Sequence, residues 1–214
     1  MRYTTIICDL DGTLLDTLQD LAEATNHALR SHGMPERTLD EVRRFVGNGV
    51  RKLMCRAIPQ GESNPQFEEC FAEFRRYYVA HCQEHTGLYP GIKEVLSELH
   101  SRGLRMAVVS NKLQAGVTEL CHVWFADTIE VAVGERPEVQ RKPAPDMVRL
   151  ALEEMGVSAE DAVYIGDSEV DVLTARNAGL PCISVLWGFR TREELLQAGA
   201  TCLVDNPKEI LDLL

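Results

Sequence analysis

The sequence predicts an α/β protein with a parallel sheet, helices on both faces of the sheet, and an inserted all-helical domain. Short apolar runs rich in β-branched residues alternate with segments of helical apolar spacing, which is typical of a parallel sheet. Between residues 17 and 85 the helical spacing continues without a strand pattern. We therefore expect a core domain formed by residues 1–16 and 86–214, and a helical cap domain formed by residues 17–85.

The first strand is predicted at Thr4–Cys8, which is short, apolar and β-branched. The cap helices that follow are defined by apolar spacing, by the capping-box pattern from Thr38 to Glu41, and by the stop signals Gly33 and Pro35. Four cap helices are expected: one from residue 18 to the Gly33 stop, one from residue 38, and two at residues 50–58 and 66–84.

Strands and helices alternate again after the turn at residues 86–91. Apolar runs mark the strands, and Gly103, Gly156 and Gly179 mark the ends of helices. The predicted strands are residues 104–110, 128–133, 162–166, 182–186 and 202–204. The predicted helices are residues 92–102 and 144–155, one ending at residue 178, and a last one from residue 207.

Composition and charge exclude several functional classes. The net charge of −11, with no run of Lys or Arg, argues against nucleic acid and anionic membrane partners. No apolar run approaches the ~20 residues of a membrane span, and the N-terminus lacks the apolar core of a signal peptide. The seven scattered cysteines form no CxxC pair, as expected for reduced thiols in a cytoplasmic protein. The sequence leaves the oligomeric state open.

Polar residues follow three of the predicted strands at their carboxyl ends. Asp9 and Asp11 follow the first strand, Ser110 and Asn111 follow the second core strand, and Asp167 follows the strand at residues 162–166. In an open parallel sheet, the carboxyl ends near the switch in strand order form the ligand crevice. We therefore expect these three segments to meet at one site.

The carboxylates of this site indicate a divalent cation. Asp9 and Asp11 are two residues apart in extended chain, so their side chains leave on the same side. Asp167 adds a third carboxylate from another strand. Three hard oxygen donors without paired Cys or His favour Mg²⁺, and the cation would neutralise the repulsion between the carboxylates.

Anion-binding groups are predicted around these carboxylates. Gly12 allows a close approach of the backbone, and the N–H groups of its turn with the Thr13 hydroxyl would form an anion-binding concavity. Ser110 adds a hydroxyl donor and Lys142 adds a fixed positive charge. A cation, a lysine, hydroxyls and backbone amides around a carboxylate are typical of a phosphoryl-transfer site.

In such a site Asp9 is the natural nucleophile, which would give an aspartyl-phosphate. Asp11 is placed to protonate the leaving oxygen and later to activate water. Arg141 and Lys112 are alternatives to Lys142 as the source of the positive charge.

Four segments resemble the four motifs of the haloacid-dehalogenase superfamily, in order and spacing, across nearly the whole chain. They are DLDGTLLDT at 9–17, SNK at 110–112, KPAPD at 142–146 and GDSEVD at 166–171. The resemblance implies a Rossmann-like core, a helical cap inserted after the first motif, and Mg²⁺ as cofactor.

The resemblance also implies roles for individual residues. These are the nucleophile Asp9, the acid/base Asp11, the phosphate ligands Ser110 and Lys142, and the metal ligand Asp167. Asp11 would also reach the metal through its main-chain carbonyl. Asp171 resembles the family's second acidic residue, an outer-shell group or occasional ligand, unless it simply favours the positive end of its helix.

Within the superfamily, Asp11 argues against the dehalogenases and the phosphonate-cleaving branch. Sugar-phosphate mutases typically carry a histidine where this chain has Leu21. The segments RRFVGNGVRKLM and LWGFRTREEL are more similar to phosphoglycolate phosphatases and their pyrophosphatase relatives. We expect a Mg²⁺-dependent phosphatase of a small phosphorylated metabolite, with phosphoglycolate first. Inorganic pyrophosphatase, a β-phosphoglucomutase-like isomerase and a non-catalytic binding module are the alternatives.

Several residues carry two interpretations each. Asn111 either binds phosphate or caps a helix. Arg51, after the glycines Gly47 and Gly49, either contacts the non-phosphate end of the substrate or lies on a solvated helix face.

Two further groups are ambiguous in the sequence. His81 and His85, with Cys82, have a spacing that suits zinc or exposed helix histidines, and we favour the latter. Trp187 and Phe189 either line the cleft or pack in the core.

Overall fold

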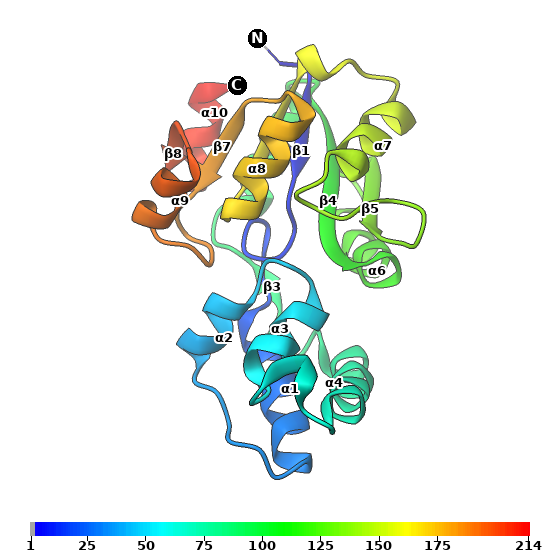
Figure 1. The fold of residues 1–214 in the computed structure, drawn as a ribbon. Helices are drawn as coiled ribbons and strands as arrows, with labels where there is room; N and C mark the ends of the chain where they lie inside the picture. The colour runs from blue at the N-terminus through cyan, green and yellow to red at the C-terminus, as the bar shows by residue number, and fades with distance from the viewer. Residues whose placement is uncertain (1–2) are drawn as a thin grey trace. The chain divides into compact units, whose positions relative to one another are not determined.

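The computed structural model describes residues 3–214, which divide into two compact units. The core unit comprises residues 3–15 and Leu88–Leu214, and the helical unit comprises Asp16–Gly87. The chain enters the helical unit after the first strand of the core and returns to the core before the next long strand (Figure 1).

The core unit is built on a parallel sheet in the order β5-β4-β1-β6-β7-β8. Its strands are β1 Thr5–Cys8, β4 Arg105–Leu113, β5 Val131–Glu135, β6 Ala162–Gly166, β7 Cys182–Val185 and β8 Cys202–Val204. The strand order changes direction at β1, because β4 and β5 lie on one side of it and β6, β7 and β8 on the other. Ligands of doubly wound sheets bind at such a switch point, beside the carboxyl ends of the strands.

Both faces of the sheet are buried, which explains why the strand sequences are continuously apolar. Successive β1 side chains point to opposite faces: Ile6 and Cys8 belong to one apolar cluster, and Ile7 to the other. Helices α5 Ile92–Ser101, α6 Gln114–Phe125 and α10 Ile210–Leu213 pack on the first face. Helices α7 Asp146–Met155 and α8 Glu169–Ala178 contribute to the second, and α9 Arg192–Ala198 packs on α8. The predicted α/β class is confirmed.

The sequence predictions missed α6 and α9. α6 begins directly after β4, and its N-cap Leu113 makes no side-chain capping bond, so the usual start signal is missing. α9 does carry a signal, a capping box formed by Thr191 and Glu194, that the pattern reading overlooked. β4 also runs on to Leu113, beyond the expected end at Ser110.

The helical unit contains α1 Leu18–Ser31, α2 Leu39–Phe45, α3 Val50–Ala57, the short 3₁₀ helix η1 Gly61–Ser63, and α4 Phe67–His81. α1 packs against α2 and α4, and α2 against α3. The predicted capping box from Thr38 to Glu41 forms at the start of α2. Strands β2 Leu15–Asp16 and β3 Gly87–Leu88 pair with each other where the chain crosses between the units. Among residues 3–214, no helix has the length and apolar character needed to cross a membrane.

Asp20 holds the segment that follows α4 onto α1. One carboxylate oxygen accepts the His85 backbone N–H at 2.9 Å, and the other accepts the Thr86 backbone N–H at 2.9 Å and the Thr86 hydroxyl at 2.7 Å. Asp20 and Thr86 are buried, so these donors depend on the carboxylate rather than on water.

The substitution Asp20→Ala should lower the free energy of unfolding by about 3 kcal/mol, because it leaves donors at Thr86 buried without an acceptor. Urea unfolding of the full chain measures the change. Asp40→Ala is the control, because Asp40 is 73% exposed and lies 3.7 Å from Arg43. It should cost under about 0.5 kcal/mol. Equal losses for the two variants would show that Asp20 is not a structural anchor.

Candidate active site

The predicted polar residues gather at the carboxyl ends of β1, β4 and β6. Cys8, the last residue of β1, is in register with Val108 of β4 and Ile165 of β6, so the residues that follow lie at one edge of the sheet. Asp9 continues this register, since its backbone N–H donates to the Ile165 carbonyl at 2.9 Å. Neighbouring parallel strands therefore bring together segments that are more than 100 residues apart in sequence.

Asp9 is buried, with 7% of its surface exposed. Its Oδ1 accepts the Leu10 backbone N–H at 2.7 Å and is 2.8 Å from Lys142 Nζ. Burial, followed by the charge of Asp171, raises the pKa of the Asp9 carboxyl well above its usual range, and Lys142 opposes this shift. Asp9 therefore needs positive charge beside it to remain ionised.

Lys142 bridges two of the site's aspartates. Its Nζ lies 2.8 Å from both Asp9 Oδ1 and Asp171 Oδ1, and it donates to the Tyr164 hydroxyl at 3.2 Å. Burial alone would lower the pKa of this lysine, but the two carboxylates outweigh burial and raise it. Of the three cations weighed from the sequence, Lys142 is the one beside Asp9, whereas Arg141 pairs with Glu135 at 3.8 Å.

Asp171 is fully buried, and protein donors occupy both of its oxygens. Oδ1 accepts from Lys142 and from the Tyr164 hydroxyl at 3.0 Å, and Oδ2 accepts the Ser168 backbone N–H and hydroxyl. Burial opposes ionisation, but the Lys142 charge and these hydrogen bonds lower the pKa of Asp171. Asp171 therefore holds Lys142 in place.

Asp167 has a different environment. Its Oδ1 accepts the Thr13 hydroxyl at 3.2 Å and its Oδ2 accepts the Phe189 backbone N–H at 2.7 Å. Burial, followed by the charge of Asp171, raises the pKa of Asp167 to about 7, while the Phe189 N–H and the Arg190 charge act in the opposite direction.

The turn after β1, which contains Gly12 and Thr13, makes contacts other than those expected from the sequence. Gly12 has φ +89°, and a Cβ there would lie 2.5 Å from Asp167 Oδ2, so glycine is required for this close approach. However, the Gly12 N–H donates to the Leu15 carbonyl and the Thr13 N–H to the Leu10 carbonyl. The Thr13 hydroxyl donates to Asp167. These groups stabilise the turn, and the expected anion-binding concavity of Gly12 and Thr13 is not formed by them.

The segment at the end of β4 contacts Asp11 and the backbone of Lys142. Ser110 is buried, and its Oγ accepts the Lys112 backbone N–H at 3.2 Å. Asn111 Nδ2 donates to the Lys142 carbonyl at 3.1 Å, so this side chain supports the Lys142 segment. The alternative helix-cap role of Asn111 is wrong, because the cap position of α6 is Leu113. Lys112 Nζ donates to Asp11 Oδ1 at 3.2 Å.

Sequence reasoning missed three contributors to the site: the Tyr164 hydroxyl, the Lys112–Asp11 pair and the Phe189 backbone N–H. The only sequence signal for Tyr164 is a hydroxyl inside an otherwise apolar strand, at residues 162–166. The sequence gives no signal for the Phe189 backbone N–H, because every residue except proline carries such a donor.

The helical unit gives Arg51 a role of its own. Arg51 pairs with Glu62 at 3.1 Å and Glu68 at 2.6 Å, and its guanidinium lies over the Phe67 ring, 4.9 Å from the ring centroid. These contacts tie α3 to η1 and α4, and they engage the guanidinium for which the sequence left two interpretations open. Gly47 and Gly49 have φ values of +117° and +78°, so both shape the turn before α3.

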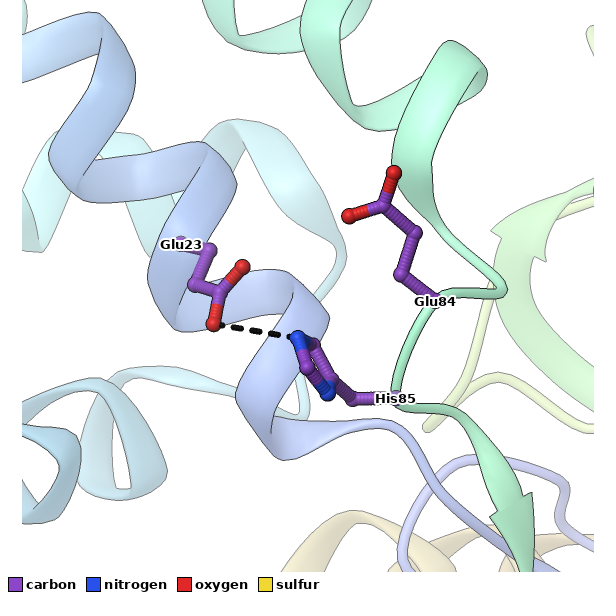
Figure 2. Close-up of side chains that lie close together, drawn as sticks. All are labelled: Glu23, Glu84 and His85. Carbon is purple, nitrogen blue, oxygen red and sulfur yellow. Dashed lines mark ion pairs between the residues drawn. The ribbon is translucent and has the colours of Figure 1, made fainter.

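The histidine pair does not form the i,i+4 helical site considered from the sequence, because α4 ends at His81. His81 pairs with Glu84 at 2.6 Å. His85 pairs with Glu23 at 3.3 Å, as Figure 2 shows. One ligand atom each from Glu23, Glu84 and His85 lies within 4.8 Å of the others. All three side chains are substantially exposed, so water screens their charges and ion pairing accounts for the cluster without a cation.

The aspartates of the core unit form a group that fits a divalent cation. One oxygen each from Asp9, Asp167 and Asp171 lies within 4.8 Å of the others, and all three residues are buried. Carboxylate oxygens are the donors that hard cations such as Mg²⁺ prefer. Lys142 supplies one positive charge against three carboxylates, and burial still raises the pKa values of Asp9 and Asp167. The donor set and its excess negative charge therefore match a divalent metal.

The sheet order and the position of this acidic group define a class: a doubly wound α/β protein with its site at the switch point. The family described as Haloacid dehalogenase-like hydrolase matches residues 6–185, and the chain belongs to this family. Several of its relatives bear the name phosphoglycolate phosphatase.

A phosphoglycolate phosphatase from Cupriavidus necator is 34% identical, covering 99% of this chain and 93% of its own. An N-acetylmuramic acid 6-phosphate phosphatase from Pseudomonas aeruginosa is 30% identical, covering 100% of this chain and 96% of its own. The crystal structure of a proposed phosphoglycolate phosphatase from Lactobacillus delbrueckii has a TM-score of 0.95 and 35% identity. It covers 100% of this chain and 98% of its own.

The substitution Tyr164→Phe should lower the free energy of unfolding by about 1–2 kcal/mol, because Asp171 and Lys142 lose a buried hydroxyl partner. Thermal or urea unfolding measures this change. Tyr77→Phe is the matched control, since the ring of Tyr77 stacks between His27 and His81 and phenylalanine preserves that packing. A loss no larger than that of the control would show that the Tyr164 hydroxyl does not support the cluster.

Proposed function

We propose that this protein is a Mg²⁺-dependent phosphatase that hydrolyses a small phosphomonoester through an aspartyl-phosphate on Asp9. The observation that carries the proposal is the buried Asp9 carboxylate beside Lys142, at the switch point of the sheet and within reach of Asp167. A nucleophile needs a fixed orientation and an ionised state. Lys142 holds Asp9 Oδ1 at 2.8 Å, and its charge together with that of a bound metal would favour the ionised carboxylate.

The contacts of Asp9 suggest which oxygen attacks. The Leu10 N–H and Lys142 Nζ both engage Oδ1, which fixes the plane of the carboxylate, so we assign Oδ2 as the nucleophilic atom. Lys142 also attracts the phosphoryl group to this place, against the net charge of the chain of −11. The Ser110 Oγ accepts a hydrogen bond from the Lys112 N–H, which leaves its proton for a phosphoryl oxygen.

Asp11 is the proposed acid/base. Lys112 Nζ donates to Asp11 Oδ1 at 3.2 Å, which gives this side chain a defined position two residues after the nucleophile. Asp9, Asp167 and the Asp11 main-chain carbonyl would hold the Mg²⁺, and Asp171 would act through Lys142. When bound, the metal supplies positive charge that favours ionised aspartates and stabilises the charge of the transferring phosphoryl group.

Phosphoglycolate is the first candidate substrate, because similar proteins from several bacteria bear the name phosphoglycolate phosphatase. A second candidate is a sugar phosphate, which the similarity to an N-acetylmuramic acid 6-phosphate phosphatase favours. Pyrophosphatase and phosphosugar mutase activities are weaker alternatives. Leu21, a buried apolar residue of α1, stands where the mutases typically have a histidine. The seven cysteines are free thiols, which suits a cytoplasmic protein.

The substitution Asp9→Asn should reduce phosphate release by more than about 10³-fold, because an amide cannot form the covalent intermediate. The change should leave the fold intact, which circular dichroism and thermal unfolding can verify. Asp127→Asn replaces an exposed aspartate and should keep wild-type activity. Hydrolysis at the normal rate by the Asp9 variant would remove the proposed nucleophile.

A panel of phosphorylated metabolites tests the substrate. With Mg²⁺ present, released phosphate is measured for phosphoglycolate, pyrophosphate, hexose phosphates, N-acetylmuramic acid 6-phosphate and nucleotides. We expect the highest kcat/KM for phosphoglycolate. A higher value for the muramic acid phosphate would select the second candidate, and isomerised sugar without free phosphate would indicate a mutase. Failure to hydrolyse the whole panel, and a generic aryl phosphate as well, would favour a non-catalytic module.

A further inference from the structure

The loop between β7 and α9 contacts both acidic segments of the site. We call residues Trp187, Gly188, Phe189 and Arg190 the strap. The Phe189 backbone N–H donates to Asp167 Oδ2 at 2.7 Å, and the Trp187 indole N–H donates to the Thr13 carbonyl at 3.0 Å. One short loop therefore bonds to the turn after β1 and to the carboxylate after β6, which are separated by more than 150 residues in the chain.

Gly188 makes this double contact possible because it has no side chain. A Cβ at this position would lie 2.3 Å from Asp167 Cβ, 2.5 Å from Asp167 Oδ2 and 2.4 Å from the Gly12 carbonyl oxygen. All these distances are below any real Cβ contact. The backbone conformation of Gly188 is open to other residues, so the requirement for glycine is purely one of space.

Arg190 anchors the other end of the strap. It is buried, and its guanidinium donates to Glu169 at 2.7 Å and 3.3 Å through two nitrogens. Glu169 is the first residue of α8 and lies two positions after Asp167. The strap therefore bonds to Asp167 itself, to Thr13, which donates to Asp167, and to Glu169, two residues further along the chain. These bonds restrict how far the Asp167 carboxylate can move.

We propose that the strap is a positioning element that orients the Asp167 carboxylate for a divalent cation and thereby sets the affinity of the site for metal. The proposal rests on the metal-dependent phosphatase function proposed above. With Oδ2 engaged by the Phe189 N–H and Oδ1 by the Thr13 hydroxyl, the plane of the carboxylate is defined before metal binds. Outer-shell hydrogen bonds of this kind orient metal ligands and raise affinity, because less order has to be created on binding.

The competing explanation is that Trp187 and Phe189 serve only to fill the apolar core. Phe189 is buried, and Trp187 packs beside an apolar cluster of the core unit. A packing role predicts a loss of stability without a change in metal affinity at temperatures where the protein is folded. The two explanations therefore differ in a measurable equilibrium constant.

The test is a titration of the full chain with Mn²⁺, in which electron paramagnetic resonance measures the concentration of free ion. Thermal unfolding is recorded in parallel. Gly188→Ala should weaken Mn²⁺ binding by about 10- to 100-fold, because the methyl group displaces Asp167. Trp187→Phe keeps the aromatic packing and removes the indole N–H, and it should weaken binding by about fivefold. Asp167→Asn should abolish Mn²⁺ binding at this site, which shows that the measured binding depends on Asp167.

Two matched controls make the same types of substitution outside the strap. Gly87→Ala adds a methyl group where nothing lies within 4 Å. Trp124→Phe removes the indole N–H of the other tryptophan, whose Nε1 is buried without a hydrogen-bond partner among the described residues. Both controls should bind Mn²⁺ as the wild type does.

Each outcome decides a different question. Wild-type binding that depends on Asp167, weakened by both strap substitutions and by neither control, supports the proposal. Strap variants that bind like the controls would overturn it, even if their melting temperatures fall, and would leave the proposed function standing. A wild type without an Asp167-dependent Mn²⁺ site would overturn both. If Gly188→Ala does not fold, the comparison of Trp187→Phe with Trp124→Phe decides.

Discussion

The core site depends on one interaction, the buried bridge from Lys142 to Asp9 and Asp171. Lys142 lies 2.8 Å from an oxygen of each carboxylate, and all three groups are removed from water. A buried charge is costly unless it is paired and hydrogen-bonded, and here every partner is supplied by a different segment of the fold. Asp171 and Tyr164 hold the lysine from one side, which leaves it directed at the nucleophile candidate Asp9.

The same arrangement explains why the site favours a divalent cation. Asp171 uses all of its hydrogen-bonding capacity on Lys142, Tyr164 and Ser168, so the single lysine charge is shared between Asp171 and Asp9. Asp167 receives only a backbone N–H, a hydroxyl and a more distant positive charge, and burial leaves its pKa at about 7. The excess negative charge therefore lies on Asp9 and Asp167 rather than on Asp171.

Much of this site could be read from residue types and their order. Asp9, Ser110 and Asp167 each follow an apolar run, and a parallel sheet necessarily places the ends of such runs together. Tyr164 and the Phe189 N–H could not be found in this way. A hydroxyl within a strand and a backbone donor on a loop become parts of a site only when distant segments are packed against them. Arg51 shows another limit, because a charge in a glycine-rich segment left two interpretations open and only the tertiary structure shows that it pairs with Glu62 and Glu68.

The sequence by itself determined the α/β class, the insertion of helices after the first strand and the acidic groups of the site. These features depend on local apolar periodicity and on residue type, which are encoded over a few residues. Only the tertiary structure decided that Lys142 rather than Arg141 or Lys112 contacts Asp9, that the Gly12 and Thr13 amides close their own turn, and that the strap reaches Asp167. Those choices depend on distances between segments far apart in the chain, which local patterns do not specify.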